Sequence, residues 1–179
     1  MMQLNGRENG SVSINIDLWR LNMKFDLLLE LKKSKKKPKE GDVFVLNPKK
    51  KVFCFGKVIM TNVESRDSFV NGMNLIFIYD YFSADENIPD DIESFNILLV
   101  EVVNNQLWIK GFAKNIAYSE VTEKEINVDY AFWDILKNEY VDIKGNTVNY
   151  IPKIKGMYGL GSYGSVGKEI YKVLEQRGL

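Results

Sequence analysis

Histidine is missing from this chain, and cysteine occurs only once, as Cys54. The lack of histidine removes the commonest general base and the usual nitrogen ligand of metal ions, which excludes Ser-His-Asp and Cys-His catalytic arrangements. One cysteine can form neither an internal disulfide nor a CxxC zinc site, so an oxidising compartment is not implied. An enzyme at this sequence would have to depend on lysine, tyrosine, carboxylates or a bound metal.

Excess charge and long apolar runs are also missing. The 24 lysine and arginine residues equal the 24 aspartate and glutamate residues, so no overall field attracts the chain to nucleic acid or membrane. No window approaches the roughly 18 apolar residues that a membrane span needs. Residues 1–13 are polar and lack the apolar core of a signal peptide. We therefore expect a cytoplasmic protein that does not contact the membrane.

What the chain does contain is a series of short runs rich in β-branched and aromatic residues, separated by turn residues. Several runs are apolar at consecutive positions, so both faces of such strands need cover, which suits a closed barrel or a sheet packed under helices. Gly56 interrupts one bulky run and predicts a bulge or sharp bend there. Asn104-Asn105 fits a two-residue hairpin between two of the runs. The predicted strands are residues 42–46, 51–60, 73–82, 96–103, 106–112, 132–136, 140–143 and 147–151.

Two segments have helical patterns. Residues 166–176 place their apolar side chains in one stripe, and a short turn at residues 120–126 has Thr122 as N-cap with Glu125 three positions on. Residues 16–31 are ambiguous, because alternation from Trp19 to Leu31 favours a strand whereas the residue types favour a helix; we favour the strand. We expect a mainly β (α+β) fold, a small antiparallel, partly closed β-barrel with a C-terminal helix, at residues 37–179, preceded by an adjunct segment at residues 1–36.

A glycine-rich motif precedes the C-terminal helix. Residues 159–164 match GxGxxG, but only 15 residues follow Gly164, too few for the second strand and acidic residue of a dinucleotide site. The motif also lacks the spacing and the Ser or Thr of a P-loop. We interpret it as a flexible turn that leads into the helix. Cys54, Trp19, Trp108 and Trp133 lie among apolar residues, so we predict that they belong to the core.

Lysines dominate residues 32–39, where Pro38 and like-charge repulsion oppose regular structure. We interpret this run as a solvated connector. The alternative function is a small β-barrel that binds nucleic acid and uses Lys32–Lys39 as a clamp on the phosphate backbone. The run lacks interleaved aromatic residues for base stacking and the whole chain is neutral, so nucleic acid is the less favoured partner.

Carboxylates gather around Pro89. The group is either a solvated loop or a docking patch for a basic partner, with Tyr81 and Phe82 at its base as anchors. A histidine-free hydrolase or transferase would need a carboxylate pair such as Asp85 and Glu86 in a pocket, and we expect no catalytic, cofactor or metal site. The predicted partner-binding residues are Asp85, Glu86, Asp90, Asp91, Glu93, Tyr81 and Phe82.

Three short motifs resemble the immunity protein 26 family of bacterial polymorphic toxin systems. They are the Gly-Asp-Val-Phe opening within residues 37–44, the Phe-Gly-Lys-Val strand within residues 52–59, and Ile-Tyr-Asp-Tyr-Phe at residues 78–82. The resemblance covers mainly residues 37–90 and implies a mostly β domain that binds and neutralises a cognate toxin domain. It carries over no catalytic residue and fixes no contact residue. A basic nuclease is one candidate toxin, since enzymes that bind phosphate are commonly basic and would complement the carboxylates near Pro89.

Overall fold

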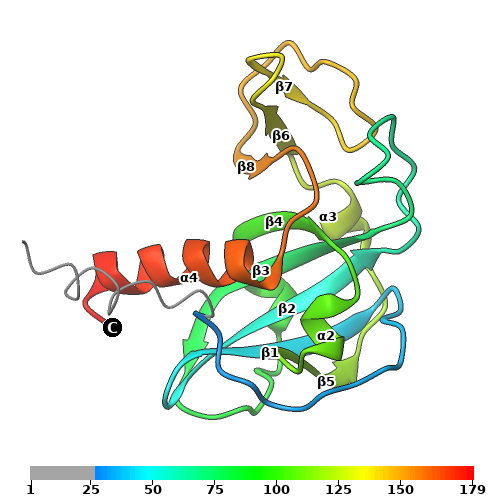
Figure 1. Ribbon diagram of the computed structural model, residues 1–179. Coiled ribbons are helices and arrows are strands. Elements are labelled where there is room, and N and C mark those ends of the chain that lie inside the picture. The colour runs from blue at the N-terminus through cyan, green and yellow to red at the C-terminus, as the bar shows by residue number, and fades with distance from the viewer. Residues whose placement is uncertain (1–26) are drawn as a thin grey trace, which may run out of the picture.

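Residues 27–179 are described by the computed structural model, and two β-sheets organise them (Figure 1). The larger sheet is antiparallel and has five strands in the order β4-β3-β2-β1-β5. The smaller sheet has three strands in the order β7-β6-β8, with β8 parallel to β6. The strands are β1 Asp42–Lys49, β2 Val52–Met60, β3 Asn74–Ser83, β4 Ile97–Val103, β5 Ala113–Tyr118, β6 Tyr130–Asp134, β7 Glu139–Val141 and β8 Ile154–Met157.

The larger sheet is open, which corrects the predicted barrel. Its edge strands, β4 and β5, do not pair with each other in the described part of the chain. The consecutive apolar residues instead serve an open sheet that is covered on both faces. The mostly β composition and the C-terminal helix are confirmed.

Two helices cover one face of the larger sheet. They are the long helix α4, Tyr163–Arg177, and the short α2, Gln106–Ile109. Val166, Ile170 and Leu174 of α4 pack with Phe44 and Ile78 of the sheet in one core cluster. Ser162 caps α4 with a capping box, and Gly178 ends the helix in the left-handed conformation. Within residues 27–179, no helix has the length and apolar character needed to cross a bilayer.

The smaller sheet covers part of the opposite face. Phe132 and Val141 of the smaller sheet form a second core cluster with Phe77 and Val100 of the larger one. Gly156 makes this approach possible, because a Cβ there would lie 2.7 Å from the Val100 carbonyl oxygen. The rest of that face is covered by a third cluster that includes Ile92 of the 3-10 helix η1, Ile92–Ser94.

Gly56 sits at a register shift between β2 and β3, which confirms the predicted bulge. A Cβ at this position would lie 2.5 Å from the Phe44 ring and 2.7 Å from the Phe77 carbonyl oxygen. Only glycine therefore lets the ring of β1 pack across β2 at this point.

The predicted hairpin at Asn104-Asn105 is wrong. Residues 106–109 form α2, and the chain then enters β5, which pairs with β1 and not with β4. Leu107 and Trp108 are adjacent and both buried, an arrangement that a helical turn provides under the sheet. The predicted strand at residues 147–151 is also wrong, since only an isolated bridge joins Thr147 to Val141.

Candidate functional site

The carboxylates predicted to bind a partner lie on the connection from β3 to β4, residues 84–96, which we call the acidic loop. Asp85, Asp90 and Asp91 are exposed and form no ion pair with any of residues 27–179. Glu86 is half-buried and pairs with Lys114 of β5. Glu93 is turned inward, with a side chain only 22% exposed. The loop thus presents three free carboxylates, and two others hold it to the body of the protein.

Aromatic side chains form the base of the acidic loop. The half-buried Tyr81 ring lies 5.8 Å from the ring of Phe55 and 4.5 Å from that of Phe95. Phe82 is also half-buried, with the Arg177 guanidinium 5.6 Å from its ring centroid. The same guanidinium places its nitrogens 2.7 and 2.8 Å from the two carboxylate oxygens of Asp80. Both predicted anchors are therefore partly used within the chain, and each keeps an accessible part.

A buried lysine fixes the far end of the acidic loop. Lys57 of β2 is fully buried, and its Nζ donates to the Glu120 carbonyl at 2.8 Å and to Glu125 Oε2 at 2.9 Å. Glu93 Oε1 lies 3.4 Å from the same nitrogen and accepts a hydrogen bond from the Ser119 hydroxyl at 2.5 Å. One ammonium group thus ties β2 to two separate loops.

Glu125 completes this network from the short helix α3, Glu123–Ile126. Its carboxylate accepts hydrogen bonds from the Thr122 backbone N–H at 2.8 Å and from the Tyr79 hydroxyl, so the predicted capping box is confirmed. Burial pushes the pKa of Glu125 upward, but these bonds and the Lys57 charge outweigh it and hold the pKa below its usual value. The pKa of Glu93 is lowered as well, because the Ser119 and Lys57 contacts outweigh its desolvation.

The lysine run forms an irregular strap beside α2. The backbone N–H groups of Leu31 and Lys32 donate to the Gly111 carbonyl, and that of Ser34 donates to the Trp108 carbonyl. The lysine ammonium groups from 32 to 39 point to solvent. Trp108 beneath them is 1% exposed and donates its indole N–H to Asn115 at 2.7 Å, so it belongs to the core as predicted and offers no exposed ring for stacking.

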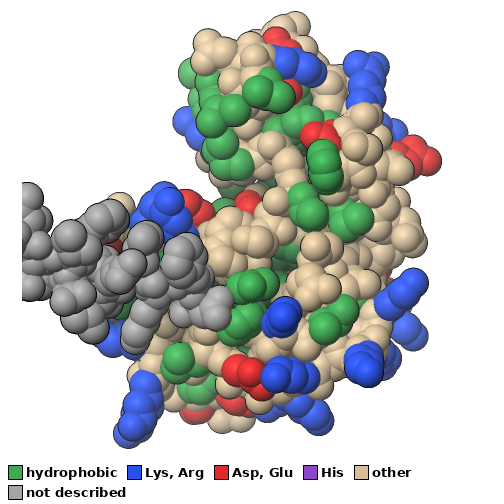
Figure 2. Space-filling model, viewed as in Figure 1, with side chains coloured by type: hydrophobic (Ala, Val, Ile, Leu, Met, Phe, Trp, Pro, Cys, Tyr) green, Lys and Arg blue, Asp and Glu red, His purple; other side chains and the backbone are tan. Residues whose placement is uncertain are grey.

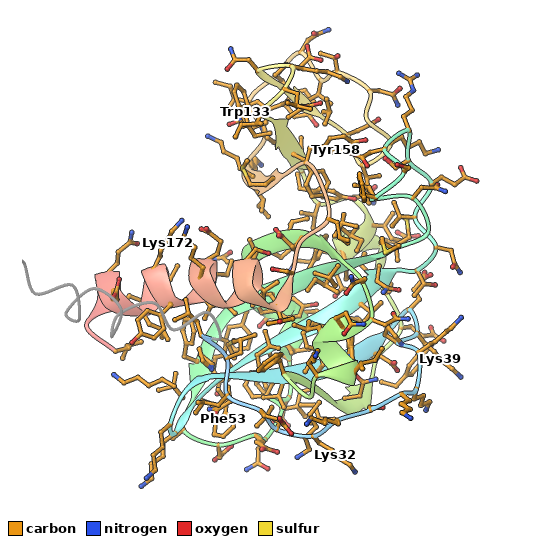
Figure 3. The ribbon with its side chains drawn as sticks, in the orientation of Figure 1. Lys32, Lys39, Phe53, Trp133, Tyr158 and Lys172 are labelled. Atoms are coloured by element: carbon orange, nitrogen blue, oxygen red, sulfur yellow. The ribbon has the colours of Figure 1, made fainter. Side chains whose placement is uncertain are left out.

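A cleft of about 490 Å³ lies between the smaller sheet and α4. Figure 3 shows Trp133 on the smaller sheet and Lys172 rising from α4 on the other side of the gap. The sheet wall carries Trp133, Tyr140, Lys155 and Met157, which share one face because Trp133 pairs with both Tyr140 and Met157. Trp133 is half-buried here, so its predicted place in the core is only partly right.

The helix wall of the cleft is polar. Ser165, Glu169 and Lys172 follow one another at helical spacing, and Lys172 pairs with Glu169 at 2.6 Å. Figure 2 shows apolar side chains gathered on the lobe above α4, beside the hollow. The cleft therefore combines an aromatic wall with a charged one.

Glu101 of β4 lies at the bottom of the cleft, beside the glycine-rich turn. It is 6% exposed and accepts a hydrogen bond from the Ser165 hydroxyl at 3.1 Å. Burial raises the pKa of Glu101 to about 7. The Glu169 charge adds to this rise, and the hydrogen bond from Ser165 opposes it. Gly161 leaves room for it, because a Cβ there would lie 2.3 Å from Glu101 Oε1. The glycine-rich motif thus serves as a turn that makes room for a buried carboxylate.

A family model described as Immunity protein 26 matches residues 39–141. The chain belongs to the immunity protein 26 family. This confirms the resemblance drawn from the Gly-Asp-Val-Phe, Phe-Gly-Lys-Val and Ile-Tyr-Asp-Tyr-Phe motifs. No curated protein and no solved structure matches the chain.

The immunity protein 26 match divides the site unevenly. It contains the acidic loop, the complete Lys57 network, and Glu101, Trp133 and Tyr140 of the cleft. It leaves out β8 and α4, which supply the remaining walls of the cleft. Within the described residues, no group of three or more carboxylate or cysteine side chains is arranged to hold a metal ion.

Lys57, Glu101 and the cleft were not predicted from the sequence as parts of a functional site. Lys57 stands inside a strand of bulky apolar residues, and a lysine at such a position indicates a buried ion pair. Glu101 stands similarly inside Leu-Leu-Val-Glu-Val-Val, where the run of apolar neighbours was the available signal. The cleft gave no local signal because its walls come from β4, the β6–β7 hairpin, β8 and α4.

Proposed function

We propose that this chain neutralises a cognate bacterial toxin domain by binding it directly, without catalysis, in the cytoplasm of the cell that makes both proteins. The observation that carries the proposal is membership of the immunity protein 26 family. The proposed partner is a basic protein such as a nuclease domain, because the acidic loop presents exposed carboxylates that form no ion pair with any of residues 27–179.

The geometry of the acidic loop supports its use as one part of the binding surface. Asp85, Asp90 and Asp91 stand exposed, while the Glu86–Lys114 pair and the inward contacts of Glu93 hold the loop in place. A surface that is already ordered loses less conformational entropy on binding. Clustered carboxylates also accelerate encounter with a basic partner by about 10-fold to 1,000-fold at low salt.

The first test is protection from the toxin encoded beside this chain. Co-expression should restore growth, and the two purified proteins should form a complex by size-exclusion chromatography. Growth arrest despite soluble expression of both proteins, together with no complex, would contradict the proposed function.

The second test separates the acidic loop from the function itself. The fourfold variant Asp85→Asn, Glu86→Gln, Asp90→Asn and Asp91→Asn should associate at least ~10-fold more slowly at low salt, with a flatter salt dependence. A control variant removes four exposed carboxylates away from the acidic loop, at Glu30, Glu40, Glu64 and Glu175, and so changes the net charge equally. If both variants associate at the same rate, the acidic loop is not part of the interface, and the immunity function stands or falls on the growth assay.

A further inference from the structure

Glu101 is a buried carboxylate with no cationic partner among the residues that the structure describes. It is 6% exposed, and within the part of the chain that the structure describes its one side-chain hydrogen bond comes from the neutral Ser165 hydroxyl. No lysine or arginine among residues 27–179 forms an ion pair with it. Buried carboxylates are almost always paired, because desolvation of the charge is costly otherwise. Lys57, with two carboxylates around it, illustrates the usual arrangement in this same chain.

The wall beside Glu101 is suited to a flat cation. Trp133 and Tyr140 pack edge to face, with ring centroids 5.0 Å apart, and both line the cleft with Met157. An indole face attracts a guanidinium group by its quadrupole and by stacking. Lys155 already lies 5.9 Å from the Tyr140 ring centroid, so this wall accommodates a cation within the chain itself.

We propose that the cleft receives an arginine side chain of the toxin, which pairs with Glu101 and stacks on Trp133. This inference rests on the proposed function and names the chemistry of one contact within it. Arginine is preferred to lysine because its planar fork can bind a carboxylate through two parallel hydrogen bonds while its face lies on an aromatic ring.

The other charges of the cleft agree with this assignment. Glu169 and Lys172 are paired with each other at 2.6 Å, and Lys155 is exposed at the rim over Tyr140. An acidic occupant would therefore find one unpaired lysine at the edge and a buried negative charge at the bottom. An apolar occupant would seal Glu101 from water without supplying a cation, which is the costly case for a carboxylate. Of these occupants, a cation is the one that neutralises the charged carboxylate at the bottom of the cleft.

The cleft can be tested with short peptides before the toxin is known. The probes are acetyl-Gly-Arg-Gly-amide and its citrulline analogue, which has the same shape but no charge, titrated at pH 8 and low salt and followed by amide and indole NMR signals. The arginine peptide should perturb the Trp133 indole and the Gly161 amide and bind at least ~10-fold more tightly than the citrulline peptide. Glu101→Gln should remove that preference, Trp133→Ala should weaken binding by about 2-fold to 5-fold, and Glu175→Gln should behave as wild type.

Equal binding of the two peptides, no perturbation of the cleft signals, or stronger binding of acetyl-Gly-Glu-Gly-amide would overturn the proposal. With the toxin in hand, Glu101→Gln and Trp133→Ala should each raise the Kd of the complex at least ~5-fold. If both variants bind the toxin as the wild type does, the cleft proposal fails while the immunity function stands. If the wild type binds no toxin, the proposed function fails, and the peptide titration still decides whether the cleft accepts arginine.

Discussion

Replacing Glu101 with glutamine should stabilise the folded chain at pH 8 and leave its stability nearly unchanged at pH 4.5. The substitution keeps the shape of the side chain and its contact with Ser165 but removes the buried charge. Burial raises the pKa of Glu101 from its ordinary 4.5 to about 7 in the folded state. That difference corresponds to about 3 kcal/mol between the two protonation states.

The direction in which stability changes with pH depends on how many protons the folded and unfolded chains bind. Between about pH 4.5 and 7 the folded chain keeps a proton on Glu101 that the unfolded chain has released. The free energy of unfolding therefore falls as the pH rises through this window, and the full penalty is present above pH 7. Glutamine has no such proton, so its advantage should grow from near zero at pH 4.5 to about 3 kcal/mol at pH 8.

Urea denaturation of both proteins at pH 4.5, 6 and 8 measures this difference directly, since the midpoint shifts at constant slope when only stability changes. Comparing the variant with the wild type at each pH cancels the titration of every other group. Glu175→Gln on α4 is the matched control, because Glu175 is exposed and should change stability by less than about 0.5 kcal/mol at every pH. A difference at pH 8 no larger than that of the control, or one of the same size at all three pH values, would refute the view of Glu101 as an uncompensated buried charge.

Two further substitutions probe the packing around the proposed surfaces. Lys57→Met should lower the free energy of unfolding by about 3–5 kcal/mol, because it leaves Glu125 buried without its cation. The control Lys50→Met, in an exposed turn, should lower it by less than about 0.5 kcal/mol. Chemical denaturation compares the two variants, and equal losses would show that the Lys57 network is not stabilising. Gly161→Ala should cost about 1–3 kcal/mol, because its Cβ would lie 2.3–2.7 Å from the Glu101 side chain. Most of that cost should disappear in a Glu101→Ala background, and an unchanged cost there would place the clash elsewhere.

The strands of the larger sheet were largely predictable because turn residues separate dense apolar runs. The runs 51–60 and 73–82 became β2, Val52–Met60, and β3, Asn74–Ser83, with ends within one residue. Helix α4 was predictable because its apolar stripe and its ending at Gly178 are local features. Such features depend on neighbouring residues alone, so the sequence contains them in full.

Whether the larger sheet closes, and which strand β5 pairs with, could not be predicted from the sequence, because neither is decided by neighbouring residues. Apolar residues on both faces of a strand require cover, but they do not say whether a neighbouring strand or a helix provides it. Residues 106–112 contain aliphatic and aromatic residues typical of a strand, yet contacts under the sheet placed Leu107 and Trp108 in a helical turn. The fit of side chains from distant segments therefore decided these elements, where propensity is only a weak guide.

In the acidic loop, too, some features are local and others depend on residues far away in the sequence. The sequence shows that carboxylates cluster around Pro89, but it does not show what each of them contacts, because those contacts are made with distant residues. Lys114 pairs with Glu86, and Ser119 and Lys57 bind Glu93, whereas no lysine or arginine among residues 27–179 pairs with Asp85. Neighbouring positions in the sequence bring the carboxylates together, and the tertiary contacts separate those that hold the loop from those that form no ion pair with any of residues 27–179.

Helix α4 borders both surfaces and relates them in space. Near its beginning Ser165 and Glu169 line the cleft, and at its end Arg177 pairs with Asp80 and covers Phe82 at the base of the acidic loop. From Ser165 to Arg177 the helix rises about 18 Å. A partner interface of ordinary size, about 800 Å² on each side, is wide enough to span that distance. One bound protein could therefore contact the acidic loop for fast association and the cleft for tight retention, and α4 would lie beneath it as a rigid spacer.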